Sequence, residues 1–348
     1  MTRDIQDKIP VVILGATGCV GQKFIQALAV HPWFSIAALC ASERSAGKNY
    51  GEAVNWLMPK PIPSHIANMK IQTCMPSMGR CIAFSGLDSS VAGEIESTFA
   101  QEGFTVVSNA RNHRMHPSVP LVVGEVNPDH LDLVKGQKFP NGGILVTNPN
   151  CSVIGITLAL KPLMQFGLES VHVVTLQAVS GAGYPGVASL DIVDNVIPFI
   201  SGEEEKVETE PLKILGNLID GTIQQASLKI SAQCNRVPVT DGHMACISVK
   251  FRHKPNPDDL IHAWESFRGE PQKLNLPTAP EKPIHYSTGL NHPQPKLHRH
   301  ADKEMAVTIG RLRPCSLFDY KFAILSHNTM RGAVGSALLN AELLVTNL

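Results

Sequence analysis

Residues 11–24 of the chain read VVILGATGCVGQKF and join a run of aliphatic residues to a helix-compatible segment, with a glycine at every third position from Gly15 to Gly21. Glycine at a strand-to-helix junction permits a tight turn, lets a pyrophosphate approach the backbone at the helix N-terminus, and allows close packing of helix on strand. The spacing is GxxGxxG instead of the usual GxGxxG, because Ala16 and Thr17 separate the first two glycines. The strand before the loop and the helix after it still favour a dinucleotide site over a structural turn. The residues expected to contact the dinucleotide are Gly15, Ala16, Thr17, Gly18, Cys19, Val20 and Gly21.

The residues after the next β-rich run indicate which dinucleotide is bound. An acidic residue at the end of that strand binds the ribose 2′-hydroxyl of NAD, whereas arginine accepts the 2′-phosphate of NADP. Here FSIAALCA is followed by Ser42, Glu43, Arg44 and Ser45. Glu43 leaves NAD open, but two hydroxyls and a guanidinium so close together favour NADP. We therefore predict NADP as the cofactor, held in part by Ser42, Arg44 and Ser45.

Short β-rich runs recur up to about residue 150, with helix-compatible stretches such as VGQKFIQALAV between several of them. Such alternation predicts an α/β fold with a doubly wound parallel sheet of the Rossmann type. The runs expected to be strands are VVILG, FSIAALC, CIAFSG, FTVVSNA, PLVVGEV and GILVTN.

The pattern changes after residue 150. A helix-compatible stretch, VIGITLALKPLMQF, is followed by longer β-rich runs such as SVHVVTLQAVSG and HMACISVKF, which predict an α+β domain with antiparallel pairing. We expect residues 1–150 to bind the dinucleotide and residues 151–327 to form a catalytic and dimerisation domain. The C-terminal stretch 328–348 has helical spacing of apolar residues and is expected to pack back on the first domain. The charged run GEEEKVETE at 202–210 is typical of a solvated helix face.

The composition of the chain excludes several classes of partner. Its 348 residues point to two domains, at about 150 residues each. Lys and Arg together number 30, as do Asp and Glu, so no broad charge favours nucleic acid or an anionic membrane. No apolar run approaches the ~18 residues that span a bilayer. The polar N-terminus MTRDIQDKIP lacks the apolar core of a signal peptide, so we expect a cytoplasmic protein with small-molecule partners.

The eight cysteines form no CxxC pair and most lie in apolar strings such as MACISV. In a reducing compartment such residues behave as small buried hydrophobes, so neither disulfides nor zinc are predicted. The string KLHRH at 296–300 holds two nearby histidines, but no third ligand follows at a suitable spacing. The sequence therefore predicts no metal site.

Cys151 differs from the other cysteines in its surroundings. In TNPNCSVIGITLAL a β-rich run passes through a polar turn into a helix-compatible stretch, which places the thiol at a helix N-terminus. Backbone N–H groups and the helix dipole stabilise a thiolate at that position. We therefore interpret Cys151 as a nucleophile, although burial as a structural residue is the commoner fate of a single cysteine.

His243 is the candidate proton carrier among the 14 histidines. It begins a β-rich run after the turn Thr240-Asp241-Gly242, and Arg236 lies seven residues earlier at the far end of the run RVPV. If the turn folds the two runs together, one short segment supplies a general acid or base and a carboxylate-binding guanidinium. A satisfied core histidine and a surface arginine remain the alternative.

The chain resembles the aspartate-semialdehyde dehydrogenase family, in its archaeal and fungal branch, along nearly its whole length. The loop at about 269–300 matches least. The ordered motifs that carry the resemblance are GATGCVGQKFIQ, ASERSAGKNYGE, FSGLDSS, SNARNHRM, TNPNCSV, LQAVSGAGYPG, EEEKVETEPLKILG and NRVPVTDGHMACISV.

The resemblance implies NADP-dependent interconversion of aspartyl phosphate and aspartate semialdehyde, which feeds lysine, threonine and methionine biosynthesis. It implies that Cys151 is the nucleophile, that His243 is the acid/base and that Gln177 orients the acyl group. The chemistry would pass through a thioester on the cysteine, because sulfur attacks acyl centres well and departs easily. A homodimer or homotetramer is implied as well.

The resemblance also implies residues for the two ends of the substrate. Arg236 would bind the substrate carboxylate, and Arg111 and Lys206 would bind phosphate, while Glu203 would contact the substrate amine or Lys206. Glu210 and Lys213 repeat the spacing of Glu203 and Lys206 seven residues further along the chain, so they are an alternative pair. Further cofactor contacts implied by the motifs are Ser85, Gly86, Ser180, Gly181 and Asn328.

Other functions remain open at this point. A malonyl-CoA reductase or similar acyl-CoA reductase would keep Cys151 and His243, and an N-acetylglutamyl-phosphate reductase follows the same logic. A non-catalytic NADP-binding redox sensor would use the thiol alone and leave Arg236, His243 and Gln177 without a task. A cofactor-free cysteine hydrolase would leave the glycine loop unused. Arg111, Glu203 and Lys206, which the resemblance assigns to the amino and phosphate ends of the substrate, favour an aminoacyl phosphate over the other substrates.

Overall fold

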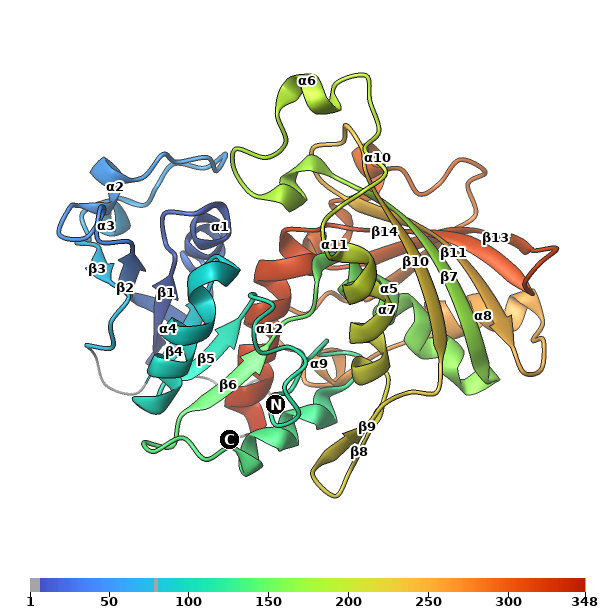
Figure 1. Ribbon diagram of the computed structural model, residues 1–348, viewed down its shortest axis with the longest axis horizontal. Helices are drawn as coiled ribbons and strands as arrows, with labels where there is room; N and C mark the ends of the chain where they lie inside the picture. The colour runs from blue at the N-terminus through green and yellow to red at the C-terminus, as the bar shows by residue number, and fades with distance from the viewer. Residues whose placement is uncertain (1–6, 78–80, 348) are drawn as a thin grey trace. The chain divides into compact units, whose positions relative to one another are not determined.

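The computed structural model describes residues 7–77 and 81–347, which form two compact units. The first unit contains the described residues up to Val122 together with His130–Asn148 and Asn340 onward, and the second contains Val123–Asp129 and Pro149–Leu339. Residues 1–6, which belong to the N-terminal stretch used to exclude a signal peptide, lie outside the described residues. Within the described residues each unit is built on a six-stranded sheet (Figure 1).

The first unit contains a parallel sheet in the order β3-β2-β1-β4-β5-β6 (Figure 1). Its strands are β1 (Ile9–Leu14), β2 (Phe34–Ala41), β3 (Gln72–Thr73), β4 (Ile82–Ser85), β5 (Thr105–Ser108) and β6 (Ile144–Thr147). Its connecting helices are α1 (Cys19–Leu28), α2 (Tyr50–Ala53), α3 (Ser64–Ala67), α4 (Ser89–Gln101) and the 3₁₀ helix η1 (Pro128–Gly136). This strand order is that of a doubly wound dinucleotide-binding sheet, so the α/β prediction is confirmed.

One predicted strand is wrong. The run PLVVGEV at 120–126 forms only an isolated bridge from Leu121 to Thr147 of β6. Directly afterwards the backbone N–H of Val123 donates to the side-chain oxygen of Asn127, and the N–H of Asn127 donates back to the carbonyl of Val123. These local bonds turn the chain away from an extended path. The apolar character of the run reflects burial, which a short apolar run cannot distinguish from strand pairing.

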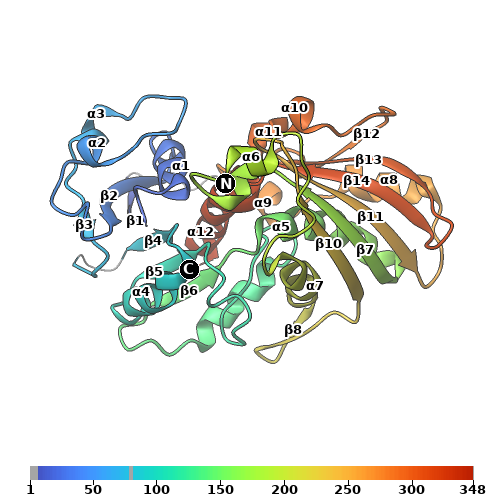
Figure 2. The ribbon, with the colours of Figure 1, turned by 45° about the horizontal axis from the view of Figure 1, so that its top comes forward.

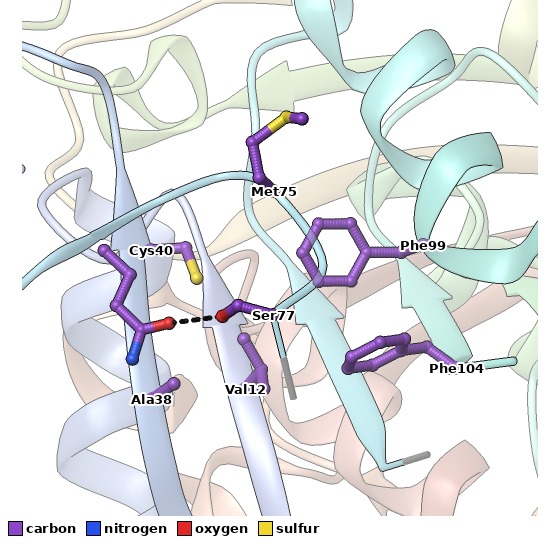
Figure 3. A pocket seen from close by; sticks show the side chains of 8 residues that line it. Val12, Ala38, Cys40, Met75, Ser77, Phe99 and Phe104 are labelled. Atoms are coloured by element: carbon purple, nitrogen blue, oxygen red, sulfur yellow. Dashed lines mark hydrogen bonds between the residues drawn. The ribbon is translucent and has the colours of Figure 1, made fainter. Parts of the chain in front are cut away.

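One face of the first sheet is covered by α4. Phe99 of α4 and Phe104 pack edge to face, with ring centroids 4.9 Å apart, on the side of the sheet that carries Val12 and Cys40. Figure 3 shows a small apolar hollow beside these side chains, where Ser77 donates a hydrogen bond to Gln72. None of the predicted site residues lines this hollow. It therefore belongs to the core packing of the unit.

The last part of the C-terminal helix α12 (Gly335–Asn347) packs within the first unit from Asn340 onward. The side-chain amide of Asn340 donates to the carbonyl of Val122 and to the side-chain oxygen of Asn148. The carboxylate of Glu342 lies 2.8 Å from Nε2 of His31, and both side chains are buried. Buried polar groups of this kind need specific partners, so they fix the register of the helix on the unit.

No helix in the described part of the chain is long and apolar enough to cross a membrane.

The second unit contains a mixed sheet in the order β10-β7-β11-β14-β13-β12. The β10–β7 and β12–β13 pairs are parallel, and the other pairs are antiparallel. Its strands are β7 (Leu168–Gln177), β10 (Lys229–Arg236), β11 (His243–Phe251), β12 (Ile284–Ser287), β13 (Val307–Pro314) and β14 (Tyr320–Ser326), with the separate hairpin β8 (Asn217–Ile219) and β9 (Thr222–Gln224). Its helices are α5 (Cys151–Leu160), η2 (Lys161–Phe166), η3 (Val179–Ala182), α6 (Ser189–Ile192), α7 (Glu203–Ile214), α8 (Pro257–Ser266), α9 (Glu270–Lys273), α10 (Pro295–His298), α11 (Ala301–Glu304) and the π-helical turn η4 (Met330–Val334).

Helix α7 lies beside the edge strand β10, as Figure 2 shows. The carboxylates of Glu204 and Glu208 accept hydrogen bonds from the backbone N–H groups of Cys234 and Ala232. These acceptors satisfy edge-strand donors that would otherwise be open to pairing. The prediction that 202–210 is a solvated face is wrong in part, because Glu203 and Glu210 are buried. Each finds polar partners in the fold, which a charge count cannot anticipate.

Helices α5 and α8 pack together on the second sheet. The indole of Trp264 in α8 donates to the carbonyl of Ala159 in α5 and packs edge to face on Phe322 of β14. At Gly155 of α5 a Cβ would lie 2.6 Å from the hydroxyl oxygen of Ser326. Only glycine allows this close approach, which sets the distance between α5 and β14.

We predict that Trp264→Ala lowers the free energy of unfolding by about 3–5 kcal/mol, since a fully buried aromatic side chain and its hydrogen bond are lost. Urea titration followed by circular dichroism measures the change. The exposed Glu265 on the same helix provides the control, and Glu265→Ala should shift stability by less than about 0.5 kcal/mol. Equal stabilities of the two variants would contradict the role given to Trp264.

Candidate functional site

The loop between β1 and α1 has the backbone geometry of a phosphate-binding turn. Gly15 has φ +79°, and a Cβ there would lie 2.9 Å from the carbonyl oxygen of Gly86. A Cβ on Gly21 would lie 2.3 Å from the carbonyl oxygen of Gly15, so the first turn of α1 can approach the loop only without a side chain. Gly18 is the N-cap of α1 and is exposed. The loop therefore brings a turn without bulky side chains to a helix N-terminus, an arrangement that suits an anion.

The predicted 2′-phosphate residues lie beside this loop. Leu14 of β1 pairs with Cys40 of β2, so the carboxyl ends of the two strands are neighbours. The chain turns directly after β2, where the N–H of Ser45 donates to the carbonyl of Ser42. Ser42 and Arg44 are exposed in this turn. The position agrees with the general rule that the end of the second strand reads the ribose, and these residues suit a phosphate there.

The other predicted cofactor residues divide between the two units. Ser85 ends β4 in the first unit, and Gly86 follows it, with Val20 of α1 against the position that a Cβ would take. Ser180, Gly181 and Asn328 belong to the second unit. There the amide of Asn328 donates to the hydroxyl of Ser180 and accepts from the N–H of Gly242.

Cys151 is the first residue of α5, as predicted, and the residue before it holds the helix start. The side-chain oxygen of Asn150 accepts from the N–H groups of Ser152 and Val153, at 2.9 and 3.3 Å. Its side-chain amide donates to both oxygens of Glu203, and its backbone N–H donates to Glu210 at 2.7 Å. Sequence reasoning missed this role of Asn150. An asparagine directly before an apolar helical run is the signal that could have revealed the cap.

The sheet brings three of the predicted residues to one end. Gln177 is the last residue of β7 and pairs with Arg236, the last residue of the parallel strand β10. β11 runs antiparallel to β7 on its other side and begins with His243, next to Met244, which pairs with Leu176. Gln177, Arg236 and His243 are all buried. The neighbouring strands, and not only the short turn at 240–242, therefore gather these side chains.

Arg236 and His243 face the same small space. A Cβ on Gly181 would lie 2.8 Å from Nη1 of Arg236 and 2.9 Å from Nε2 of His243. Gly181 is exposed, so the two side chains lie beneath an open backbone. The guanidinium of Arg236 also donates to the carbonyl of Ala178, at 2.7 Å. The charge of Cys151 is among those that act on Arg236, and opposite charges favour a thiolate beside a guanidinium.

His243 is held as a neutral ring. The N–H of Ala178 donates to Nδ1 at 3.1 Å, so the proton of the neutral imidazole lies on Nε2. Burial lowers the pKa of His243 to about 3, with further lowering by the charges of Arg236 and His327, while Asp241 acts in the opposite sense. A second ring proton, on Nδ1, would point at the N–H of Ala178, which disfavours the charged ring. The ring is therefore suited to donate a hydrogen bond from Nε2.

Glu203 joins the cysteine helix to Gln177. Its carboxylate accepts from the Gln177 amide at 3.2 Å and from Nζ of Lys206 at 2.7 Å. Burial by itself raises the pKa of Glu203, but the charge and hydrogen bond of Lys206, with the amides of Gln177 and Asn150, outweigh burial and lower it. Lys206 is about one fifth exposed, at 22%. An ammonium group at the edge of the cluster can therefore contact a ligand.

The alternative pair, Glu210 and Lys213, is more deeply buried. Glu210 is 2% exposed and Lys213 is 4% exposed. Burial lowers the pKa of Lys213 to about 8, against the opposing charge of Glu210. Since Glu210 binds the backbone of Asn150, this pair supports the helix start from within the core.

Arg111 lies in the first unit, exposed and three residues after the end of β5. Its charge contributes to the low pKa of Asp88, whose largest causes are the hydrogen bonds from Ser90. Its predicted contact with phosphate stays a prediction.

Two further residues act at the site and were missed. A Cβ on Gly332 would lie 2.7 Å from Cβ of Cys151, so this glycine packs directly on the predicted nucleophile. The charge of His327 acts on His243. Both come from the segment that follows β14, more than 170 positions after Cys151 in the case of Gly332, and no pattern near the cysteine points to them.

The fold adds a third side chain to the histidines of KLHRH. Potential ligand atoms of His300, Glu304 and His327 lie within 4.8 Å of one another. However, Nδ1 of His327 faces the N–H groups of Thr329 and Met330 at 3.4 Å, which places the ring proton on Nε2, the atom turned toward Glu304. A histidine that binds a metal through Nε2 instead carries its proton on Nδ1, which donates a hydrogen bond. The geometry favours a hydrogen-bonded cluster, and the prediction of no metal site stays a prediction.

Two family models match the chain. Residues 10–134 match the NAD binding domain of semialdehyde dehydrogenases, and residues 160–331 match the semialdehyde dehydrogenase dimerisation domain. Both matches fall on one family of enzymes and together span most of the chain.

Similar proteins carry the corresponding name. An aspartate-semialdehyde dehydrogenase of Archaeoglobus fulgidus is 49% identical over 338 residues, which is 96% of this chain and 97% of the relative. One of Schizosaccharomyces pombe is 49% identical over 348 residues, with 96% and 97% covered. The crystal structure of the Candida albicans aspartate-semialdehyde dehydrogenase with NADP has a TM-score of 0.89 and 42% identity, covering 97% of this chain and 99% of that one.

These names and models do not favour an acyl-CoA reductase or a non-catalytic sensor. They agree with the motifs, the sheet order and the arrangement around Cys151. The chain belongs to the aspartate-semialdehyde dehydrogenase family.

Proposed function

We propose that this chain catalyses the NADP-dependent reductive dephosphorylation of L-4-aspartyl phosphate to L-aspartate 4-semialdehyde, through a thioester on Cys151. The observation that carries the proposal is the joining of the Cys151 helix start to Glu203 and Gln177 through Asn150. Family membership and the NADP named for the Candida albicans structure support it. The resemblance places the reaction in lysine, threonine and methionine biosynthesis.

The residues of the first unit fit the dinucleotide. A loop with no room for side chains at Gly15 and Gly21 leaves backbone N–H groups for the pyrophosphate. Ser42, Arg44 and Ser45 would hold the 2′-phosphate. NADPH, when bound, supplies the hydride that reduces the acyl group.

Cys151 acts as the nucleophile in this proposal. Its thiolate is favoured by the N-terminus of α5 and by Arg236, and it attacks the carbonyl carbon of the acyl phosphate. The C–O bond to phosphate breaks, inorganic phosphate leaves with the bonding electrons, and the acyl group remains on sulfur. Backbone N–H groups at the start of α5 can hold the tetrahedral oxyanion.

The substrate is bound at both ends. Arg236 binds the α-carboxylate, which a guanidinium can contact with two parallel hydrogen bonds. Glu203 receives the α-ammonium group, and Gln177 orients the acyl group between them. Lys206 and Arg111 bind phosphate. Glu203 and Lys206 are preferred to Glu210 and Lys213 because they reach Gln177 and the edge of the cluster.

His243 donates a hydrogen bond from Nε2 to the oxyanion that forms at the acyl carbon and stabilises its negative charge until the aldehyde leaves sulfur. The neutral state of the ring supports this role, because Nδ1 accepts from the N–H of Ala178 and the ring proton lies on Nε2. A neutral ring with its proton on Nε2 cannot first accept the thiol proton there. Ionisation of Cys151 then depends on the helix and on Arg236.

We further propose the domain roles, the assembly and the location of the protein. Residues 1–150 with 328–348 bind NADP, and residues 151–327 form the catalytic and dimerisation domain. A homodimer or homotetramer is supported by the matched dimerisation domain and by apolar side chains that are more than half exposed: Tyr184, Leu190, Val193, Val196 and Phe199. All eight cysteines are reduced, which suits a cytoplasmic enzyme.

The first test is NADP⁺ reduction at 340 nm with L-aspartate semialdehyde, with and without phosphate or arsenate. We expect turnover that requires the oxyanion and that falls by at least about 10³-fold in Cys151→Ala, because no acyl-enzyme can form. Cys246→Ala is the matched control, since that exposed cysteine lies in the middle of β11. Phosphate-dependent turnover retained by Cys151→Ala would refute the thioester mechanism.

The two Glu–Lys pairs can be separated by substitution of the lysines. Lys206→Ala should raise the KM for phosphate by about 10-fold or more, because one phosphate-binding charge is lost. Lys213→Ala should chiefly lower stability, by about 3 kcal/mol, because Glu210 then stays buried without that charge. Steady-state kinetics and urea titration measure both. A larger KM effect for Lys213→Ala would reverse the assignment.

His243 predicts a pH dependence of stability. Its pKa is depressed in the folded state, to about 3, so the unfolded chain binds the extra proton first as the pH falls. The stabilisation is complete above the unfolded pKa of about 6.5 and is lost progressively toward pH 3. Between pH 7.5 and 5, His243→Gln should therefore lose up to about 2 kcal/mol less free energy of unfolding than the parent. Identical losses in urea titrations would show that the ring is not held neutral.

A further inference from the structure

The turn after β14 has an unusual backbone. In η4 the N–H of Gly332 donates to the carbonyl of His327 at 3.0 Å, and the N–H of Val334 donates to the carbonyl of Thr329 at 3.1 Å. Both bonds span five residues, which is the π-helical pattern. Such turns hold one residue more than an α-helical turn, are rare, and occur frequently at functional sites.

A buried ion pair holds this turn. The guanidinium of Arg331 donates to both oxygens of Glu125, at 2.8 and 2.5 Å, and neither side chain is exposed. The hydroxyl of Ser336 donates to the carbonyl of Arg331. The backbone of Glu125 packs closely on Gly269, because a Cβ on Gly269 would lie 2.5 Å from the Cα of Glu125. The pair therefore links η4 to a tightly packed backbone segment.

Stability alone is a weak reason for such a pair. Removing two charges from water costs free energy that the ion pair recovers only with excellent geometry, and a packed apolar pair is often as stable. What the pair does achieve is a fixed register for the turn. A relaxation of η4 to an α-helical turn would move the preceding residues by one position, which is about 100° around the axis and 1.5 Å along it.

The residues that would move contact the proposed site on two sides. Gly332 packs on Cβ of Cys151, where even a methyl group has no room. Asn328 holds Gly242, the residue directly before His243, and Ser180, the residue directly before Gly181. The turn and the residue Asn328 shortly before it thus contact the nucleophile and two backbone segments next to His243.

We propose that Glu125 and Arg331 are positioning residues that keep η4 in its π-helical register and thereby fix Cys151 and Asn328. The inference rests on the proposed role of Cys151. Neither charge contacts substrate, and both act through the turn. Their loss should change the reactivity of the thiol and the catalytic rate, and not only the stability of the fold.

The test compares Glu125→Gln and Arg331→Lys with the parent enzyme. Two readouts are used: the kinetics of semialdehyde oxidation, and the pH dependence of Cys151 alkylation by iodoacetamide, followed by mass spectrometry. We expect kcat to fall about 10- to 100-fold, with KM within about 3-fold, since a displacement near 1 Å at a reacting group has such an effect. The pH of half-maximal alkylation should shift by at least about half a unit.

An exposed ion pair of the same unit supplies the control. Arg252 and Glu169 lie 3.4 Å apart with side chains 71% and 41% exposed, and Glu169→Gln should leave both readouts unchanged. The pair Glu125 and Arg331 should also show strong coupling in a double-mutant cycle, whereas Arg252 and Glu169 should not. Unchanged kcat and alkylation in Glu125→Gln and Arg331→Lys would overturn the proposal.

Ser336→Ala keeps the proposal falsifiable if the charge variants do not fold. It removes only the hydrogen bond to the carbonyl of Arg331. It should lower kcat by about 2- to 5-fold and shift the pH of half-maximal alkylation in the same direction as the charge variants do. A folded Ser336→Ala with parental values would then count against the proposal. The alkylation readout needs no substrate, so parent protein that lacks turnover would refute the proposed function without deciding the role of the ion pair.

Discussion

Asn150 holds the first turn of α5 with both ends of its side chain and with its backbone. Its oxygen caps the N–H groups of Ser152 and Val153, while its two kinds of N–H donate to Glu203 and Glu210. Buried carboxylates are stabilised at a helix N-terminus, where unpaired donors and the positive end of the dipole meet. Cys151 follows directly, so its position and charge environment are consequences of this cap. Every role proposed for the thiol depends on it.

The sheet of the second unit supplies the remaining geometry. Gln177 and Arg236 end parallel strands, and His243 begins the antiparallel strand on the other side of β7. Gln177 lies far from Arg236 and His243 in sequence, but strand pairing fixes the spacing of all three to within the regular distances of a sheet. Glu203 then joins Gln177 to Asn150, which connects the end of the sheet to the start of the helix. Hydrogen bonding between strands therefore sets most of the geometry of the site, and a few side chains connect the sheet to the helix.

Local sequence patterns predicted the parts whose chemistry is local. The glycines of residues 11–24 specify a strand, a turn without side chains and a helix, and the structure contains all three. The same reasoning failed at 120–126, where apolar residues are buried without forming a strand. It also failed in part at 202–210, where charged residues are buried and not solvated. Apolar and charged residues report an environment only on average, since tertiary partners can satisfy either kind.

The sequence by itself determined the α/β class, the glycine loop, the thiol at a helix start and, through its ordered motifs, the family. These features depend on residues that lie close together in the chain, where turn geometry and helix ends act over a few positions. Only the tertiary structure decided that Asn150 binds two carboxylates, that His243 carries its proton on Nε2, and that Glu125 and Arg331 hold the turn against Cys151. These hydrogen bonds and ion pairs, of which that between Glu125 and Arg331 joins residues 206 positions apart, leave no local pattern, because each partner alone resembles an ordinary polar residue.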